Sequence, residues 1–149
     1  MMRMRTVIEC VVIVAAASVA CASEYRQRLE VVQCQAADAT FQAEALQVCS
    51  PWPEYEYFRA LALQLAGNAE HFVDAGEMWA NCADGWWSEY SRLKVMQVTG
   101  QKYDPMELLD AKAQYDKCVS KCLQCCDQAA FEAKVSLMQT AYCRVMLPQ

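Results

Sequence analysis

Apolar residues in the first half of the chain recur at alternating intervals of four and three positions. That spacing places them on one face of an α-helix. The stripe comprises Tyr25, Leu29, Val32, Ala36, Ala39, Ala43 and Leu46. Cys34, Phe41 and Val48 repeat every seven residues and are expected to widen the same face. The pattern predicts a helix over residues 24–49, with a bend near Asp38.

Prolines and glycines divide the middle of the chain into shorter predicted helices. Pro51 ends the first helix, and Pro53 suits the first position of the next. Gly67 and Asn68 are expected to stop that second helix, and the Asp84–Gly85 pair to form a turn. The predicted helices of this region span residues 53–67, 69–82 and 86–98.

The last helix has the clearest local start signal. Asp104 suits the capping position, Pro105 suits the first helical position, and Glu107 completes a capping box. No glycine or proline follows until Pro148, so the helical segment extends to about Met146. Alternating β-branched runs are missing from the sequence. These patterns together predict an all-α fold, a small disulfide-stapled bundle of about five helices.

The start of the chain has the layout of a secretory signal peptide. A short basic stretch precedes an apolar run over residues 7–20, and small residues follow. The small residues allow a cut after Ala20 or after Ala22, and we prefer the second. We therefore expect residues 1–22 to be a signal peptide and 23–149 to be one disulfide-rich domain. No later apolar run reaches the roughly 20 residues that a membrane span needs.

The charge balance excludes some partners. The chain carries 13 basic and 18 acidic residues, a formal net charge of −5. Nucleic acids and anionic membrane surfaces reward clustered Lys and Arg, so neither is an expected partner. The mild acidity of the chain is compatible with a basic partner.

Cysteine usage points to an oxidising compartment. Four of the cysteines lie within the nine residues CVSKCLQCC, on one face of a predicted helix. We expect structural disulfides here, in preference to redox catalysis or a metal site, because secreted chains keep such cysteines oxidised. The eight cysteines expected to pair are Cys34, Cys49, Cys82, Cys118, Cys122, Cys125, Cys126 and Cys143.

The distribution of these cysteines constrains their pairing. Five lie after Asp104 and three before it, so pairing all eight within one chain requires a bridge between two of the later cysteines. Neighbouring cysteines on one helix bond only with strain. A break near Asp127–Gln128, with the last helix folding back, satisfies the constraint. The alternative is that one or two cysteines pair with a second chain, giving a disulfide-linked dimer instead of a monomer.

Catalytic chemistry finds little support in the sequence. His71 is the single histidine, and Glu70, Asp74 and Glu77 follow helical spacing beside it. A solvated helix face explains this set better than a metal or acid–base site does. We therefore predict no catalytic, cofactor-binding or metal-binding residues, and no cofactor.

Aromatic residues provide the candidate binding surface. Trp86 and Trp87 are consecutive, and consecutive helical residues point about 100° apart, so at least one of them should be partly exposed. Exposed aromatic rims are frequent binding anchors. Trp52 and Tyr55 complete the candidate set.

The function that fits these observations is binding. We expect a secreted, cysteine-rich helical protein that acts on an extracellular protein target, as a signal, toxin or venom-like effector does. The first alternative is an extracellular carrier that holds a small apolar ligand between helices. The second is a secreted enzyme of unknown class.

Overall fold

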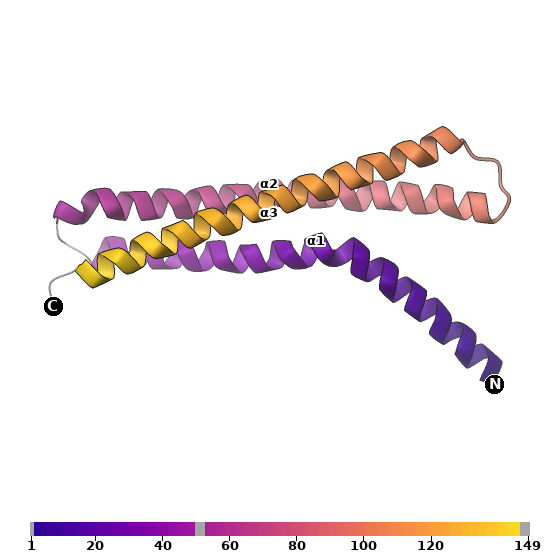
Figure 1. The fold of residues 1–149 in the computed structure, drawn as a ribbon, viewed down its shortest axis with the longest axis horizontal. Helices are drawn as coiled ribbons and strands as arrows, with labels where there is room; N and C mark the ends of the chain where they lie inside the picture. Colours follow the sequence, from indigo (N-terminus) through magenta and orange to yellow (C-terminus); the bar gives the residue numbers. More distant parts are fainter. Residues whose placement is uncertain (1, 50–52, 147–149) are drawn as a thin grey trace.

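The chain forms long helices in the computed structural model, which describes the backbone of residues 2–49 and 53–146 and the side chains of 24–48 and 53–146. The three α-helices and one short 3-10 helix are α1 (Met2–Cys49), η1 (Pro53–Tyr55), α2 (Glu56–Val98) and α3 (Pro105–Met146). Figure 1 shows α2 and α3 side by side, with the second half of α1 against them. No strand occurs among the described residues, so the predicted all-α class is confirmed.

The helices form an up-down-up bundle. α2 and α3 are antiparallel, and the loop between them, residues 99–104, contains the αL residue Gly100 that ends the first of the two (φ 73°). Ser136 Oγ of α3 donates a hydrogen bond to the Ala62 carbonyl of α2 at 2.7 Å. Thr40 of α1 donates to Glu70 of α2 at 2.9 Å. With 43 residues, α2 alone is about 64 Å long.

The predicted division into about five helices is corrected to three α-helices within the described residues. α2 continues through Gly67 and Gly85, and α3 continues through Asp127, where a break was expected. Both glycines are exposed, and each costs a helix only about 1 kcal/mol. Burial of the inward-facing residues on either side of each glycine outweighs that cost.

Small side chains fill much of the core. The buried alanines are Ala36, Ala39, Ala43, Ala62, Ala66, Ala69, Ala80, Ala83, Ala111, Ala129 and Ala133. The closest approach is at Gly76 of α2. A Cβ atom there would lie 3.2 Å from Leu29 Cδ1 of α1 and 3.3 Å from Cys125 Cβ of α3. All three helices therefore meet at a position that only glycine fills without displacing a neighbour.

The stretch CVSKCLQCC marks a change of register in α3. Buried residues elsewhere in this helix are spaced three and four apart, but Cys118, Cys122 and Cys126 are spaced four and four. An extra four-residue step of this kind is a stutter, which locally unwinds the supercoil of a helical bundle. The cysteines on the inner face therefore occupy core positions of the bundle.

The expected widening of the apolar face of α1 is wrong. Phe41 is 72 % exposed and Val48 85 % exposed, and Cys34 is also exposed. Each lies five residues after a core position, which is about 140° around the helix from it. These three side chains consequently face away from the bundle.

A second, smaller core lies toward the loop between α2 and α3. Leu93, Leu108 and Ala111 are buried there, with Trp86 and Tyr90 packed against them. The cluster contains no described residue of α1, whose first described side chains meet α2 near Asp84. Among the described residues this end of the bundle is therefore a two-helix layer.

Candidate binding surface at the end of the bundle

Trp87 occupies the centre of an aromatic cluster. Its ring centroid lies 5.0 Å from that of Tyr115 and 5.7 Å from that of Tyr90. Trp86 packs against both cores, and both tryptophans are half-buried. Packing on two sides fixes the indole of Trp87 while leaving part of it accessible.

Polar contacts hold α1 to α2 close to this cluster. The buried Tyr25 hydroxyl donates a hydrogen bond to Asp84, and Arg26 forms an ion pair with the same carboxylate. Arg26 also donates to Asn81 Oδ1 at 2.7 Å. Burial raises the pKa of Tyr25 above its ordinary value, and the hydrogen bond to Asp84 raises it further. This phenol therefore stays protonated.

A lysine of α3 completes the aromatic cluster. The ammonium of Lys112 lies 5.2 Å from the ring centroid of Tyr115 and 5.9 Å from that of Tyr90. Both distances fall within the range of cation–π contacts. Lys112 also forms an ion pair with Asp116 at 3.0 Å. The cluster therefore has the Lys112–Asp116 ion pair beside its aromatic rings.

A hollow on the surface extends from Trp87 along α2 toward the loop. It is lined by Trp87, Ser88, Ser91, Arg92, Val95, Met96 and Gln101. We call Trp87, Ser88, Ser91, Val95 and Met96 the Trp87 surface. Val95, a member of this set, is 58 % exposed.

The Trp87 surface continues the side of α2 that carries α1. Asn81 and Asp84 contact Arg26 of α1. Ser88, Ser91 and Val95 follow them at the same alternation of four and three residues. One face of α2 therefore contacts α1 at one end and no described side chain of α1 at the other.

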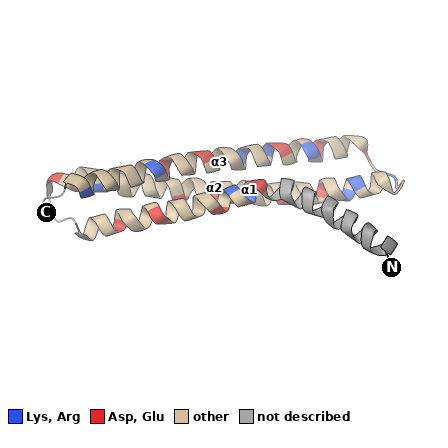
Figure 2. Ribbon diagram, turned by 60° about the horizontal axis from the view of Figure 1, so that its bottom comes forward, with Lys and Arg blue, Asp and Glu red and all other residues tan. Residues whose placement is uncertain are grey.

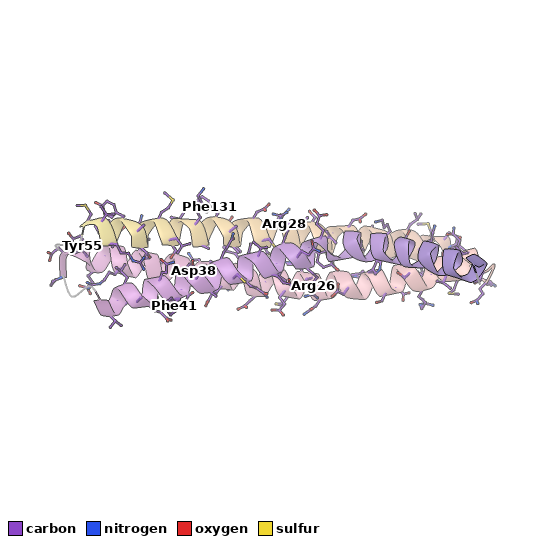
Figure 3. All side chains as sticks on the ribbon, turned by 90° about the horizontal axis from the view of Figure 1, so that it is seen from below. Arg26, Arg28, Asp38, Phe41, Tyr55 and Phe131 are labelled. Atoms are coloured by element: carbon purple, nitrogen blue, oxygen red, sulfur yellow. The ribbon has the colours of Figure 1, made fainter. Side chains whose placement is uncertain are left out.

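Tyr55, another member of the predicted surface, does not join it. Tyr55 lies at one end of the bundle, far from Arg26 (Figure 3), and its hydroxyl donates to the Met146 carbonyl at 2.7 Å. Along the axis, Tyr55 is about 48 Å from Trp87. Trp52 lies outside the described residues. Of the three predicted members that the structure describes, it brings Trp86 and Trp87 together.

The described cysteines are thiols in the structure. Cys118, Cys122, Cys126 and Cys143 are buried, whereas Cys34 and Cys82 are exposed. Burial raises the pKa of Cys122 to about 12, and contacts with the Cys126 thiol add to that effect. The side chain of Cys49 lies outside the described residues, and the predicted pairing of all eight cysteines stays a prediction.

The described part of the chain contains no arranged metal site. No group of three or more His, Cys, Asp or Glu side chains there is arranged to hold a metal ion. His71 is exposed on α2, with its ring 6.0 Å from that of Phe72. Nor does any helix in this part combine the length and apolar character needed to cross a bilayer.

Sequence reasoning missed two apolar features. One is a groove along the seam of α1 and α3, lined by Gln35, Ala130, Ala133, Lys134, Leu137, Met138 and Ala141. The other is a second apolar stripe on the outer side of α1, which contains Phe41 and Val48. Its three–four spacing was visible in the sequence, but the residues were assigned to the core.

Comparison with known proteins identifies no relative. No protein-family model, curated protein or solved structure matches the chain.

Proposed function

We propose that this protein is an extracellular binding module whose Trp87 surface receives a helical segment of a protein target. One observation carries the proposal. The side of α2 that contacts α1 continues past the part of α1 whose side chains are described. That side bears the half-buried Trp87 and the exposed Val95. A partner helix placed there would pack as α1 does and would extend the three-helix arrangement along α2 and α3.

The chemistry of the Trp87 surface suits protein recognition. Tryptophan anchors held by neighbouring rings lose little conformational freedom on binding, which makes them frequent hot spots. Ser88 and Ser91 supply hydrogen-bonding groups beside the indole, and Val95 and Met96 supply apolar area. An amphipathic helix has the complementary shape and polarity.

Secretion is part of the same proposal. The signal-peptide layout over residues 1–22 and the cysteine content support an oxidising destination, outside the cell, for a domain spanning 23–149. A stapled helical protein with an aromatic contact surface fits a signal, toxin or venom-like effector. Mass spectrometry of the secreted chain tests this point, with Ser23 as the expected first residue.

The binding test uses the full-length chain, expressed in a secreting cell line and taken as the cell processes it. The protein is incubated with intact cells and extracellular fluid, cross-linked, and its contact peptides are identified. Trp87→Ala is expected to reduce target recovery at least tenfold, and Trp87→Phe to reduce it less. Tyr57→Ala is the control, because Tyr57 is 71 % exposed at the other end of α2. Equal recovery with Trp87→Ala and Tyr57→Ala contradicts the proposal.

A carrier role is the second candidate, and the groove between α1 and α3 favours it. The groove encloses about 470 Å³, and Ala133, Leu137 and Met138 give it apolar walls. A fluorescent apolar probe should bind the native protein, and Ala141→Trp should weaken this binding, because Ala141 is an exposed residue that lines the groove. If the probe binds wild type and Ala141→Trp equally, or neither of them, the carrier role is wrong.

A further inference from the structure

The outer side of α1 carries a second helical stripe, separate from the one that forms the core. Its members are Val31, Cys34, Asp38, Phe41, Ala45 and Val48, again spaced three and four apart. Five of the six are apolar or weakly polar, yet all but Ala45 are exposed. The solvent-facing side of a bundle helix is ordinarily charged and polar. We call these six residues the α1 outer stripe.

The spacing of the stripe is that of a coiled-coil seam. Side chains at alternating intervals of three and four residues fit between those of a partner helix. Phe41 and Val48 each leave more than two thirds of their surface exposed, and Val31 leaves 56 %. The stripe runs for about five turns, a length over which two helices bury a continuous apolar strip. Figure 3 shows Phe41 pointing away from the bundle, close to Asp38 on the same helix.

The charge around the stripe is of one sign. From Leu29 to Cys49 the chain contains Glu30, Asp38 and Glu44 but no lysine or arginine. All three carboxylates are exposed, and Figure 2 shows this part of α1 with acidic colour only. The nearest preceding cation, Arg28, is paired with Asp127 of α3. A partner that approaches this side of α1 therefore meets apolar side chains with one carboxylate among them, Asp38, and two beside them, Glu30 and Glu44.

We propose that the α1 outer stripe binds a basic amphipathic helix of a partner protein, which packs on α1 as a fourth helix. Lysine or arginine beside the apolar seam of that helix would face Glu30 and Glu44, and a cation within the seam would face Asp38. A second copy of this chain is a poorer occupant, because pairing two outer stripes places acidic residues against acidic residues. The surface is distinct from the Trp87 surface and does not depend on it.

The test uses two synthetic peptides of three heptads, each with leucine at the seam positions. The basic peptide carries lysine and arginine at the flanking positions, and its matched control carries glutamate there. The full-length chain is expected to bind the basic peptide, with affinity that falls as salt is raised, and to bind the acidic peptide at least tenfold more weakly.

Substitutions locate the binding. Phe41→Ser and Asp38→Lys should each weaken binding of the basic peptide about tenfold or more, and circular dichroism checks that both variants keep their helix content. Phe131→Ser is the control, because Phe131 is 60 % exposed but lies on α3. Trp87→Ala should leave peptide binding unchanged, which separates this inference from the proposed function.

Three results would overturn the inference. The first is equal binding of the basic and acidic peptides. The second is equal loss of binding in Phe41→Ser and Phe131→Ser, which would indicate non-specific apolar contact. The third is a dimer in sedimentation experiments that Phe41→Ser converts to a monomer, because the stripe would then be occupied by a second copy of the chain.

Discussion

Two buried hydroxyls on α3 differ in whether they have a partner. Ser136 Oγ donates to the Ala62 carbonyl, whereas Thr140 Oγ1 has no hydrogen-bond partner among the described residues. A buried polar group left without a partner costs about 1–3 kcal/mol. Thr140→Val keeps the shape and removes that group, so we expect the free energy of unfolding to rise by about 1 kcal/mol.

Ser136→Ala is the matched control for this prediction. It removes a satisfied hydrogen bond, so the free energy of unfolding should fall by about 1 kcal/mol. Urea denaturation followed by circular dichroism measures both changes. A loss of stability in Thr140→Val would mean that its hydroxyl is satisfied in solution.

The thiol of Cys122 makes stability depend on pH at alkaline values. Burial raises its pKa from an ordinary value of 9.0 to about 12. The folded state therefore keeps a proton that the unfolded chain loses, so stability is full below about pH 9 and declines as the pH rises toward about 12. Under reducing conditions, Cys122→Ala should make this decline shallower than it is in the wild type. Denaturation midpoints measured across that pH range show whether the two slopes differ.

At the scale of one element, the continuity of α2 can be tested at its glycines. A Cβ atom at Gly67 or Gly85 meets nothing within 4 Å, whereas one at Gly76 meets Leu29 and Cys125. Alanine is better than glycine in a helix by about 1 kcal/mol. Gly67→Ala and Gly85→Ala should therefore each stabilise the protein by about 0.5–1 kcal/mol, as measured by thermal unfolding.

Gly76→Ala should behave in the opposite way, because overpacking costs typically about 1–3 kcal/mol and cancels the helical gain. We expect it to be less stable than either of the other two variants by at least about 1 kcal/mol. Destabilisation by Gly67→Ala and Gly85→Ala would indicate that α2 is broken at these positions, as the sequence alone suggests.

The elements could be predicted from the sequence where apolar periodicity decides them. The core stripe of α1 from Tyr25 to Leu46 is buried as expected, and α3 begins at Pro105. The breaks at Gly67 and Gly85 were wrong because local propensity at an exposed glycine is smaller than the burial on either side of it. The stutter at Cys122 required knowing which residues of α3 are buried.

The candidate site was only partly predictable for the same reason. Adjacent tryptophans on a helix cannot both face the centre of a core, so Trp86 and Trp87 could be selected from spacing alone. Their separation from Tyr55 depends on the unbroken length of α2, which the sequence did not indicate. Phe41 and Val48 must lie on the outer side of α1 if the stripe from Tyr25 to Leu46 is buried. Which of the two stripes is buried, however, depends on how α1 packs against the other helices.

At the scale of the whole molecule, an unbroken α3 limits the disulfides. In a chain beginning at Ser23, α3 contains five cysteines and the rest of the chain three: Cys34, Cys49 and Cys82. Bridges between neighbouring cysteines of one helix are strained. At least two cysteines of α3 should therefore remain thiols in the monomer. Cys122 and Cys126 are the best candidates, because burial shields them from solvent.

This prediction is checked by alkylating the denatured, unreduced monomer and counting modified cysteines by mass spectrometry. Two or more alkylated sites within α3 are expected. A monomer without free thiols would mean that α3 breaks and folds back, or that it contains strained bridges.

The central claim is that the protein works by binding a helix at the end of its bundle, on the Trp87 surface. Hydrogen–deuterium exchange of the full-length chain, alone and bound to its cross-linked target, tests this most directly. Protection on binding is expected in residues 84–98 of α2 and 105–116 of α3, where burial by the target should slow the opening of the helices. Protection confined to the opposite end of the bundle, around Tyr55 and Met146, would contradict the claim.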